Sequence, residues 1–247
     1  MDELVSIIMP TYNCGKFIAE TIRSAQAQTY ANWELIVVDD CSTDDTEATV
    51  RGLCDSRIRY DKLRENSGAA VARTRAMELA NGKYMAFLDS DDLWAPEKLA
   101  RQIAFMERND CAFTCTSYDQ IDEGGTALGR IIRAKPRTNY NGMLLSCPVG
   151  NSSVMYDAGK LGKFSVPNIR KRNDDALWLA MLKVEPNIVG IDEILMHYRI
   201  RSNSISSRKT QLVKYHWILY REIEKLPLWR CVFHVGFWVF LKVFHIK

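Results

Sequence analysis

The sequence predicts an α/β domain built on a doubly wound, mostly parallel sheet with helices on both faces. Short apolar runs alternate with helical patterns from residue 4 to residue 109, which is the order that parallel sheets require. Acidic or polar residues follow three of these runs, and ligands bind at the carboxyl ends of strands in open α/β sheets. The length of 247 residues suits one large domain, or one domain with an appendage.

The first half of the chain divides into four strand–helix units. We expect strands over residues 4–9, 33–38, 58–63 and 83–89, and helices over 15–28, 44–54, 68–80 and 96–109. Pro10 closes the first strand, and Ile18, Ile22 and Ala25 share one face of the first helix. Pro96 suits the first turn of the fourth helix.

The second half has a different pattern. Runs over 112–121 and 127–133 flank Glu123-Gly124-Gly125, which is a hairpin signal. We expect further strands over 152–155, 188–191 and 194–200, and a helix over 174–183.

Residues 208–247, called the tail below, differ from the rest in charge and hydropathy. They hold eight Lys/Arg and two Asp/Glu, a net charge of +6, which leaves −3 on the other residues because the whole chain carries +3. Such a basic segment suits an anionic surface, either membrane or nucleic acid. Two helices are expected, over 208–225 and from Pro227 onward.

The second tail helix has an uneven distribution of polar residues. Its polar side chains fall on one arc: Arg230, His234, Lys242 and His245. The apolar run over 235–241 is far shorter than the roughly 20 residues of a membrane span. We therefore expect an interfacial helix on a membrane surface. The alternative is a helix packed on the body of the protein or on a partner subunit.

The segment Phe87-Leu88-Asp89-Ser90-Asp91-Asp92 is the most informative motif. An apolar run ends here in three carboxylates within four positions. Packing these acids at the end of a buried strand costs free energy through mutual repulsion unless a cation lies among them. The motif predicts a metal site at the edge of the sheet and a phosphate-bearing substrate.

Polar residues after two other strands complete the expected crevice. Tyr12 follows the first strand and offers a flat face to a base, whereas Asp40 follows the second and offers an acceptor to a base N–H or a ribose hydroxyl. Asp89 and Asp91 supply oxygens to a hard divalent cation that bridges a diphosphate. Together these residues predict a site for a nucleoside diphosphate.

These motifs resemble the inverting glycosyltransferases of family 2, which have the GT-A fold. The resemblance is ordered along the chain from Val5 to Asp92, thins after residue 120, and returns at Arg172. It is carried by the segments 5–13, 28–30, 33–46, 66–68, 72–73, 82–84, 87–92 and 172–179.

The resemblance implies a role for each matching residue. Residues implied to bind the donor are Pro10, Thr11, Tyr12, Asp40, Asn66, Arg73, Asp89, Ser90 and Arg199, with Tyr12 and Asp40 on the uracil of a UDP-sugar and Arg199 facing the diphosphate. Residues implied to hold Mn²⁺ or Mg²⁺ are Asp91, Asp89 and Asp92, with Asp91 the more direct ligand and Asp92 supporting it. The implied general base is Asp174, with Asp175 as the alternative because Asn173 stands where the family has Glu.

The resemblance also implies the organisation and setting of the protein. Residues 1–207 form the GT-A domain, with a nucleotide-sugar-binding half over 1–120 and an acceptor-binding half over 121–207. The expected reaction adds a hexose or N-acetylhexosamine to a glycan or polyprenyl-diphosphate-linked saccharide in surface polysaccharide synthesis. We expect a cytoplasmic enzyme, peripheral on the inner face of the membrane, without a nucleic-acid partner and with a homodimer left open. The amino terminus has no signal-peptide pattern, and the seven cysteines are expected as free thiols.

Two other functions are weighed against this one. A sugar-1-phosphate nucleotidyltransferase calls for a Gly-rich loop bearing Lys or Arg after the first strand, and the segment 10–16 offers one Gly, one Lys and no Arg. A non-catalytic nucleotide- or glycan-binding protein would not need both the acid cluster and Asp174. For single residues, the structural alternatives are a core position for Tyr12 and capping of the next helix by Asp39 or Asp40.

Overall fold

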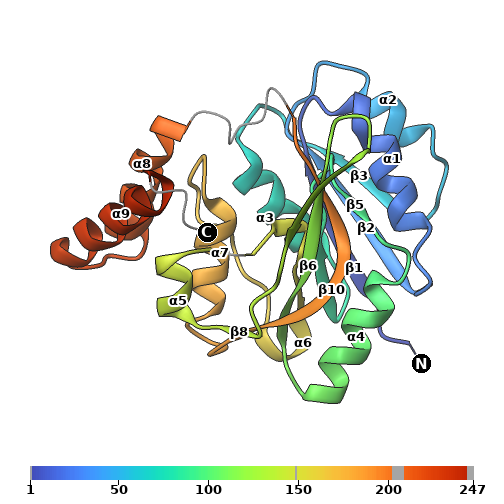
Figure 1. The fold of residues 1–247 in the computed structure, drawn as a ribbon. Helices are drawn as coiled ribbons and strands as arrows, with labels where there is room; N and C mark the ends of the chain where they lie inside the picture. Colours follow the sequence, from blue (N-terminus) through green and yellow to red (C-terminus); the bar gives the residue numbers. More distant parts are fainter. Residues whose placement is uncertain (1, 148, 202–208, 244–247) are drawn as a thin grey trace.

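The computed structural model of the chain describes residues 2–147, 149–201 and 209–243. Figure 1 shows a central sheet with helices on both faces and the C-terminal helices to one side. Within the described residues the sheet has ten strands in the order β3-β2-β1-β4-β9-β6-β10-β5, with β7 paired to β6 and β8 to β10. The predicted α/β fold class, a mostly parallel sheet flanked by helices, is confirmed.

The first half follows the predicted strand–helix order closely. Its elements are β1 (Val5–Thr11), α1 (Gly15–Gln26), β2 (Trp33–Asp39), α2 (Thr46–Arg51), β3 (Ile58–Lys62), α3 (Ala69–Leu79), β4 (Tyr84–Phe87), β5 (Leu93–Trp94) and α4 (Lys98–Asn109). Strands β1–β4 pair in parallel. Side chains alternate between faces: Ile7 packs on the side of α1 and α4, and Ile8 on the side of α3 and α7 (Asn173–Met181). This alternation places the helices on both faces.

The second half extends the sheet with strands of mixed direction. Its remaining elements are β6 (Phe113–Ile121), β7 (Ala127–Ile132), β8 (Arg137–Thr138), α5 (Tyr140–Leu145), η1 (Asn151–Ser153), β9 (Met155–Asp157), α6 (Ala158–Leu161) and β10 (Ile188–Arg199). The predicted hairpin is present as β6 and β7. Two predictions were wrong. The two strands expected over 188–200 are one strand with register shifts near Ile194, and residues 151–153 form a 3₁₀ turn that precedes β9.

The tail contains two helices that pack on one another and on the second half. Helix α8 (Lys209–Ile218) continues as a π-helical segment, η2 (Leu219–Ile223), and α9 (Leu228–Val243) follows. The buried carboxylate of Glu224 accepts from the Tyr140 hydroxyl at 2.5 Å and pairs with Lys183 at 2.8 Å. The Tyr220 hydroxyl donates to the Leu144 carbonyl. The tail is therefore anchored on α5 and just beyond α7, as Figure 1 shows.

Helix α9 is oriented differently from the sequence expectation. His234, predicted on the solvated polar arc, is buried and packs on the Tyr220 ring at 5.5 Å between centroids. The opposite, apolar face is exposed, with Trp229 at 71% and Phe233 at 54% of their full accessible surface. The side chains of Lys242 and His245 lie outside the described residues. Among the residues that the structure describes, we find no helix that is both long enough and apolar enough to cross a bilayer.

Candidate active site

Three loops meet at the carboxyl edge of the parallel strands. The register pairs Thr11 with Asp39, so the loops after β1 and β2 begin at the same level. The Asn13 amide N–H donates to Ser42 Oγ at 2.8 Å, which ties these two loops together. The Cys14 thiol donates to the Ser90 carbonyl at 3.3 Å, which ties the first loop to the acid cluster. The three predicted loops therefore lie next to one another at this edge of the sheet.

Tyr12 and its neighbours occupy different environments in the first loop. The Tyr12 ring is 48% exposed, so it is not a core residue and its face is open to a ligand. Pro10 and Thr11 belong to β1 and are buried. The Thr11 hydroxyl finds no hydrogen-bond partner among the described residues, and Asn66 Nδ2 donates to the Asp40 carbonyl at 3.2 Å.

Asp39 and Asp40 have separate structural tasks. Asp39 Oδ1 accepts from the Ser42 amide, in the turn toward α2. The buried Asp40 carboxylate accepts from the Ser67 amide at 2.6 Å and from the Gly68 amide at 2.8 Å. Gly68, with φ of +94°, precedes α3, so Asp40 fixes the amino end of α3 rather than capping α2.

Asp89 is held by two side chains from distant parts of the chain. Its Oδ1 accepts from Arg73 Nη2 at 3.0 Å and from Asn151 Nδ2 at 2.8 Å. Burial raises the pKa of Asp89, Arg73 opposes this shift, and the Asp91 and Asp174 carboxylates add to it. Within the described residues, hydrogen bonds engage only Oδ1, which leaves Oδ2 for another ligand.

Asp91 and Asp92 point in different directions. Asp91 Oδ2 pairs with Arg201 Nη1 at 2.9 Å, and this side chain is about a quarter exposed. Asp92 is buried; it accepts from the Ser152 hydroxyl at 2.5 Å and from the Arg199 amide at 3.0 Å. Burial, followed by the charges of Asp91 and Asp89, raises the pKa of Asp92 well above its usual range. Asp92 therefore fixes the acid loop to Ser152 and to the end of β10.

Helix α7 brings two acids toward the cluster. Arg73 also donates through Nη1 to the Asn173 side chain, so one guanidinium joins Asp89 to the first residue of α7. Asp174 is partly exposed and has no hydrogen bond or ion pair to any described side chain. Asp175 is buried and pairs with Arg172 at 3.0 Å. Of these two acids, Asp174 is the one available to a ligand.

Two arginines that the sequence predicted for the donor site are enclosed by other protein groups. Arg73 is only 4% exposed and joins protein groups rather than facing open space. The Arg199 guanidinium is enclosed: its Nη2 pairs with Glu20 at 2.7 Å, and its Nε donates to the Asp91 carbonyl at 2.8 Å. Because its side chain has no exposed surface, the Arg199 guanidinium serves to join these segments of the protein. Arg201, two residues further along, pairs through its side chain with the Asp91 carboxylate of the acid cluster.

The structure adds residues that sequence reasoning missed. Asn151 and Ser152 contact Asp89 and Asp92 from the 3₁₀ turn, and Ser152 Oγ also accepts from the Asp89 amide at 3.0 Å. The available signal was the run Asn151-Ser152-Ser153 just before a buried strand, because small polar residues that are buried there need partners.

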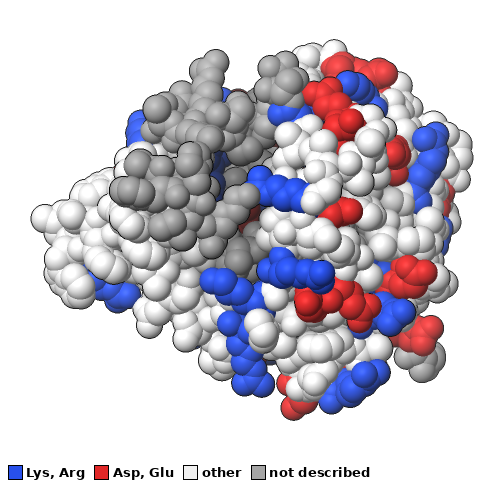
Figure 2. All heavy atoms as spheres, in the orientation of Figure 1, with Lys and Arg blue, Asp and Glu red and all other residues white. Residues whose placement is uncertain are grey.

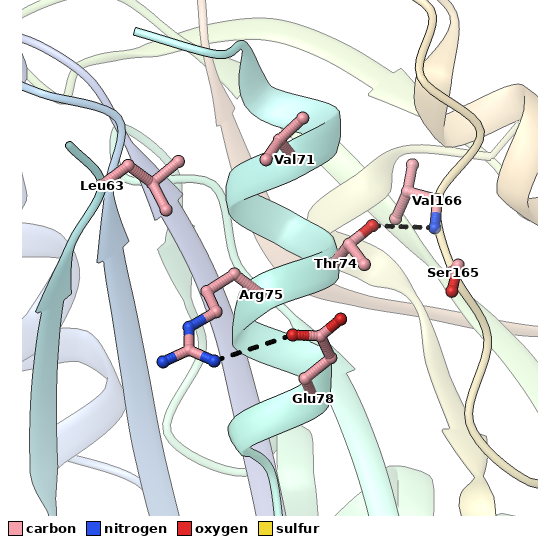
Figure 3. Close-up of a pocket in the computed structure, with 7 residues that line it drawn as sticks. All are labelled: Leu63, Val71, Thr74, Arg75, Glu78, Ser165 and Val166. Carbon is pink, nitrogen blue, oxygen red and sulfur yellow. Dashed lines mark hydrogen bonds and ion pairs between the residues drawn. The ribbon is translucent and has the colours of Figure 1, made fainter. Parts of the chain in front are cut away.

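Thr74, next to Arg73, faces a separate pocket. This pocket of about 320 Å³ is lined by Leu63, Val71, Thr74, Arg75, Glu78, Ser165 and Val166, as Figure 3 shows. The Thr74 hydroxyl accepts from the Val166 amide at 2.9 Å. Thr74 therefore anchors the segment that leads to α7 and makes no contact in the crevice.

Comparison with known proteins identifies relatives over nearly the whole chain. The family model "Glycosyl transferase family 2" matches residues 6–166. The chain is 44% identical to the putative teichuronic acid biosynthesis glycosyltransferase TuaG of Bacillus subtilis, over 90% of this chain and 89% of that protein. It is 39% identical to the UDP-Glc:alpha-D-GlcNAc-diphosphoundecaprenol beta-1,3-glucosyltransferase WfgD of Escherichia coli, over 96% and 92%.

Solved structures share the fold at lower identity. Residues 1–349 of S. aureus TarS in complex with UDP-GlcNAc align with a TM-score of 0.72 and 21% identity, over 92% of this chain and 68% of that one. The mannosyltransferase PcManGT from Pyrobaculum calidifontis, in complex with GDP-Man and Mn²⁺, aligns with a TM-score of 0.68 and 17% identity, over 96% and 70%. Because the family model covers well over half of the chain and TuaG and WfgD match it nearly end to end, the chain belongs to glycosyl transferase family 2 and is a glycosyltransferase.

Proposed function

We propose that this glycosyltransferase moves a sugar from a UDP-sugar, with inversion and with a divalent cation, to a saccharide carried on a polyprenyl diphosphate. One observation carries the proposal: Arg73 joins Asp89 of the acid cluster to Asn173, the residue before Asp174. An inverting transfer is a single displacement that needs a base on the acceptor side and stabilisation of the leaving diphosphate on the other. Arg73 holds groups suited to these two tasks next to one another.

The donor pocket is built from the first two loops. The exposed Tyr12 ring offers a stacking face for uracil. Each Asp40 oxygen already accepts one backbone N–H and keeps a second lone pair for a base N–H. The unpartnered Thr11 hydroxyl supports a polar ligand here. UDP is favoured because WfgD is named for UDP-Glc and the TarS structure holds UDP-GlcNAc.

The acid cluster fits a cation that is shared with the substrate. Within the described residues no group of three or more His, Cys, Asp or Glu side chains converges as a metal cage. Among the described residues, Asp89 and Asp91 each have one carboxylate oxygen that takes part in no hydrogen bond or ion pair. Mg²⁺-type cations are held by one or two carboxylates together with substrate phosphates, so these donors suit Mn²⁺ or Mg²⁺. Such a cation would stabilise charge on the leaving diphosphate.

Asp174 is proposed as the general base. Asp174 is partly exposed and lies in the first turn of α7. Asp175 is buried and pairs with Arg172 at 3.0 Å. The base must reach an acceptor hydroxyl, and of this pair Asp174 is partly exposed whereas Asp175 is buried.

The tail is proposed to rest on the inner face of the cell membrane. The exposed face of α9 consists of large apolar side chains: Leu228, Trp229, Val232, Phe233, Val239 and Phe240. In Figure 2 the region of α8 and α9, on the left, is mostly white, so few charged side chains are visible there. Apolar helix faces with basic residues such as Lys225 and Arg230 nearby suit an anionic lipid surface. WfgD is named for an acceptor on diphosphoundecaprenol, which is a membrane lipid.

The membrane proposal has a direct test. Wild type should float with vesicles that contain anionic lipid, and the double variant Trp229→Ser/Phe233→Ser should not. The matched control Leu128→Ser, on the exposed strand β7, should float like wild type. A homodimer through the same face is the rival explanation. The membrane proposal would be wrong if wild type and double variant floated equally. If wild type also sedimented as a dimer and the double variant did not, the exposed face of α9 would instead be a dimer interface.

The catalytic proposal is tested with separate readouts for binding and transfer. Sugar-nucleotide hydrolysis with Mn²⁺ or Mg²⁺ is measured together with calorimetric UDP binding. Asp91→Ala should lose metal-dependent UDP affinity. Asp174→Asn should keep that affinity and lose roughly 10²–10⁴-fold in rate, the usual contribution of a general base. Glu107→Gln, exposed on α4, is the control. Equal UDP affinity in wild type and Asp91→Ala would overturn the metal assignment, and full activity of Asp174→Asn would overturn the base.

A further inference from the structure

Each carboxylate of the acid cluster has its own partner inside the protein. Asp89 pairs with Arg73, Asp91 pairs with Arg201, and Asp92 accepts from Ser152 and from the backbone of Arg199. The two acids suited to a cation are therefore both paired with a guanidinium group. In each case the guanidinium stands where a cation would supply positive charge.

The two arginines differ in how firmly they are held. Arg73 is buried and also binds Asn173, so it is part of the framework. The Arg201 side chain is 27% exposed. Its guanidinium lies 4.9 Å from the Phe17 ring centroid and 4.0 Å from Cys14 Sγ. Among the described residues, Asp91 provides its ion pair at 2.9 Å. Arg201 can therefore leave Asp91 without uncovering a buried charge.

The contacts of Arg199 hold the backbone of this region, so that only the Arg201 side chain has to move away from Asp91. Its backbone N–H donates to Asp92, and its Nε donates to the Asp91 carbonyl at 2.8 Å. These contacts fix the end of β10 to the backbone of the acid loop. The Asp91 backbone is thus held whether or not its carboxylate is paired with Arg201.

We propose that Arg201 is a counter-cation that occupies Asp91 until a divalent cation arrives together with a diphosphate. The inference rests on the proposed function, because it takes Asp91 as a metal ligand. A divalent cation that bound Asp91 without a nucleotide would lie close to the positive charge of Arg201, which opposes its binding. A diphosphate would bring negative charge next to both Arg201 and the cation, and would offset the repulsion between their positive charges. Arg201 thereby makes cation binding conditional on the nucleotide.

The test measures metal affinity directly, without turnover. Mn²⁺ binding is followed by electron paramagnetic resonance, with and without UDP, in wild type, Arg201→Gln, Arg201→Lys and Asp91→Asn. Arg23→Gln, exposed on α1, is the matched control. Arg201→Gln should bind Mn²⁺ alone about two- to fivefold more tightly, the range that one partly exposed ion pair is worth. Its gain in Mn²⁺ affinity on adding UDP should be correspondingly smaller. Arg201→Lys, which keeps the charge, should behave like wild type.

The outcomes separate this inference from the metal assignment. If Asp91→Asn binds Mn²⁺–UDP as tightly as wild type, the metal assignment fails and the inference falls with it. If Asp91→Asn loses binding but Arg201→Gln binds Mn²⁺ alone no more tightly than Arg23→Gln, only the inference is overturned. Matched thermal unfolding curves of the Arg201 variants show that the comparison concerns folded protein.

Discussion

Lys98 lowers the stability of this protein at neutral pH. Its side chain is fully buried at 0% exposure, with Nζ donating to Gln102 Oε1 at 2.7 Å and lying 4.2 Å from the Trp94 ring centroid. Burial lowers the pKa of Lys98 from 10.5 to about 7. Between these two values the unfolded chain binds more protons than the folded one, so stability rises with pH. At pH 7 the cost is on the order of 4 kcal/mol.

Replacing Lys98 by Met removes this cost and keeps most of the volume. The variant loses the hydrogen bond and leaves Gln102 Oε1 unpaired, a loss of about 1–3 kcal/mol. We therefore expect Lys98→Met to be more stable than wild type at pH 7, by about 1–3 kcal/mol. The difference should shrink as the pH rises and reverse near pH 10, where Lys98 is neutral in the folded state and the remaining cost has fallen to about 1 kcal/mol.

Urea unfolding at pH 7, 8.5 and 10 measures this difference. The matched control is Lys135→Met, an exposed lysine on the segment between β7 and β8, which should differ from wild type by a pH-independent amount within about 0.5 kcal/mol. If Lys98→Met were less stable than wild type by the same amount at all three values, the desolvation argument would be refuted.

Three further predictions concern packing and buried pairs. Asp175→Asn should lower the free energy of unfolding by about 3–5 kcal/mol in urea titrations, because Arg172 loses its partner. Arg199→Met should destabilise by a similar amount, since Glu20 and the acid-loop carbonyl lose their donors; an unchanged urea midpoint would contradict the enclosed arrangement. Gly82→Ala should lower the thermal midpoint, because its Cβ would lie 2.6 Å from the Ser6 amide nitrogen.

The sequence pattern predicted the long helices and strands. It missed the strands that are too short to show a regular repeat of apolar residues. Strands β1, β2 and β4 are buried on both faces and have nearly continuous apolar sequences, so their positions were predictable. Strands β5 and β8 have two residues each, which is too short for any alternation. Strand β10 was divided in two because Asp192 and Glu193 interrupt its apolar run. In the structure a register shift follows Ile191 and lets the strand continue.

The candidate site was predictable where it depends on strand ends and not where it depends on side-chain pairing. Parallel strands align their carboxyl ends, so Tyr12, Asp40 and Asp91 could be placed in one region from their positions alone. The choice between Arg199 and Arg201 depends on which one meets Glu20, a residue on α1 that is distant in sequence. Likewise, the burial of Arg73 depends on Asn173, one hundred residues away. One sequence does not encode such pairings in a local pattern.

The way in which the charge of the acid cluster is compensated decides whether the fold requires a bound cation. The sequence argument expected a divalent cation to compensate three adjacent acids. The structure shows that Arg73, Arg201 and the hydrogen bonds to Asp92 already do so within the protein. The stability of the fold should therefore not depend on a bound cation, whereas binding of the nucleotide should depend on it.

This consequence is open to a simple thermal test. Removing divalent cations with EDTA should leave the midpoint of unfolding unchanged, because no uncompensated charge appears. Adding Mn²⁺ together with UDP should raise the midpoint, since a ligand that binds only the native state stabilises it by about 2.7 kcal/mol at one hundred times its dissociation constant. A fall in the midpoint with EDTA alone would mean that the arginines do not neutralise the cluster, and that the cation is a structural part of the fold.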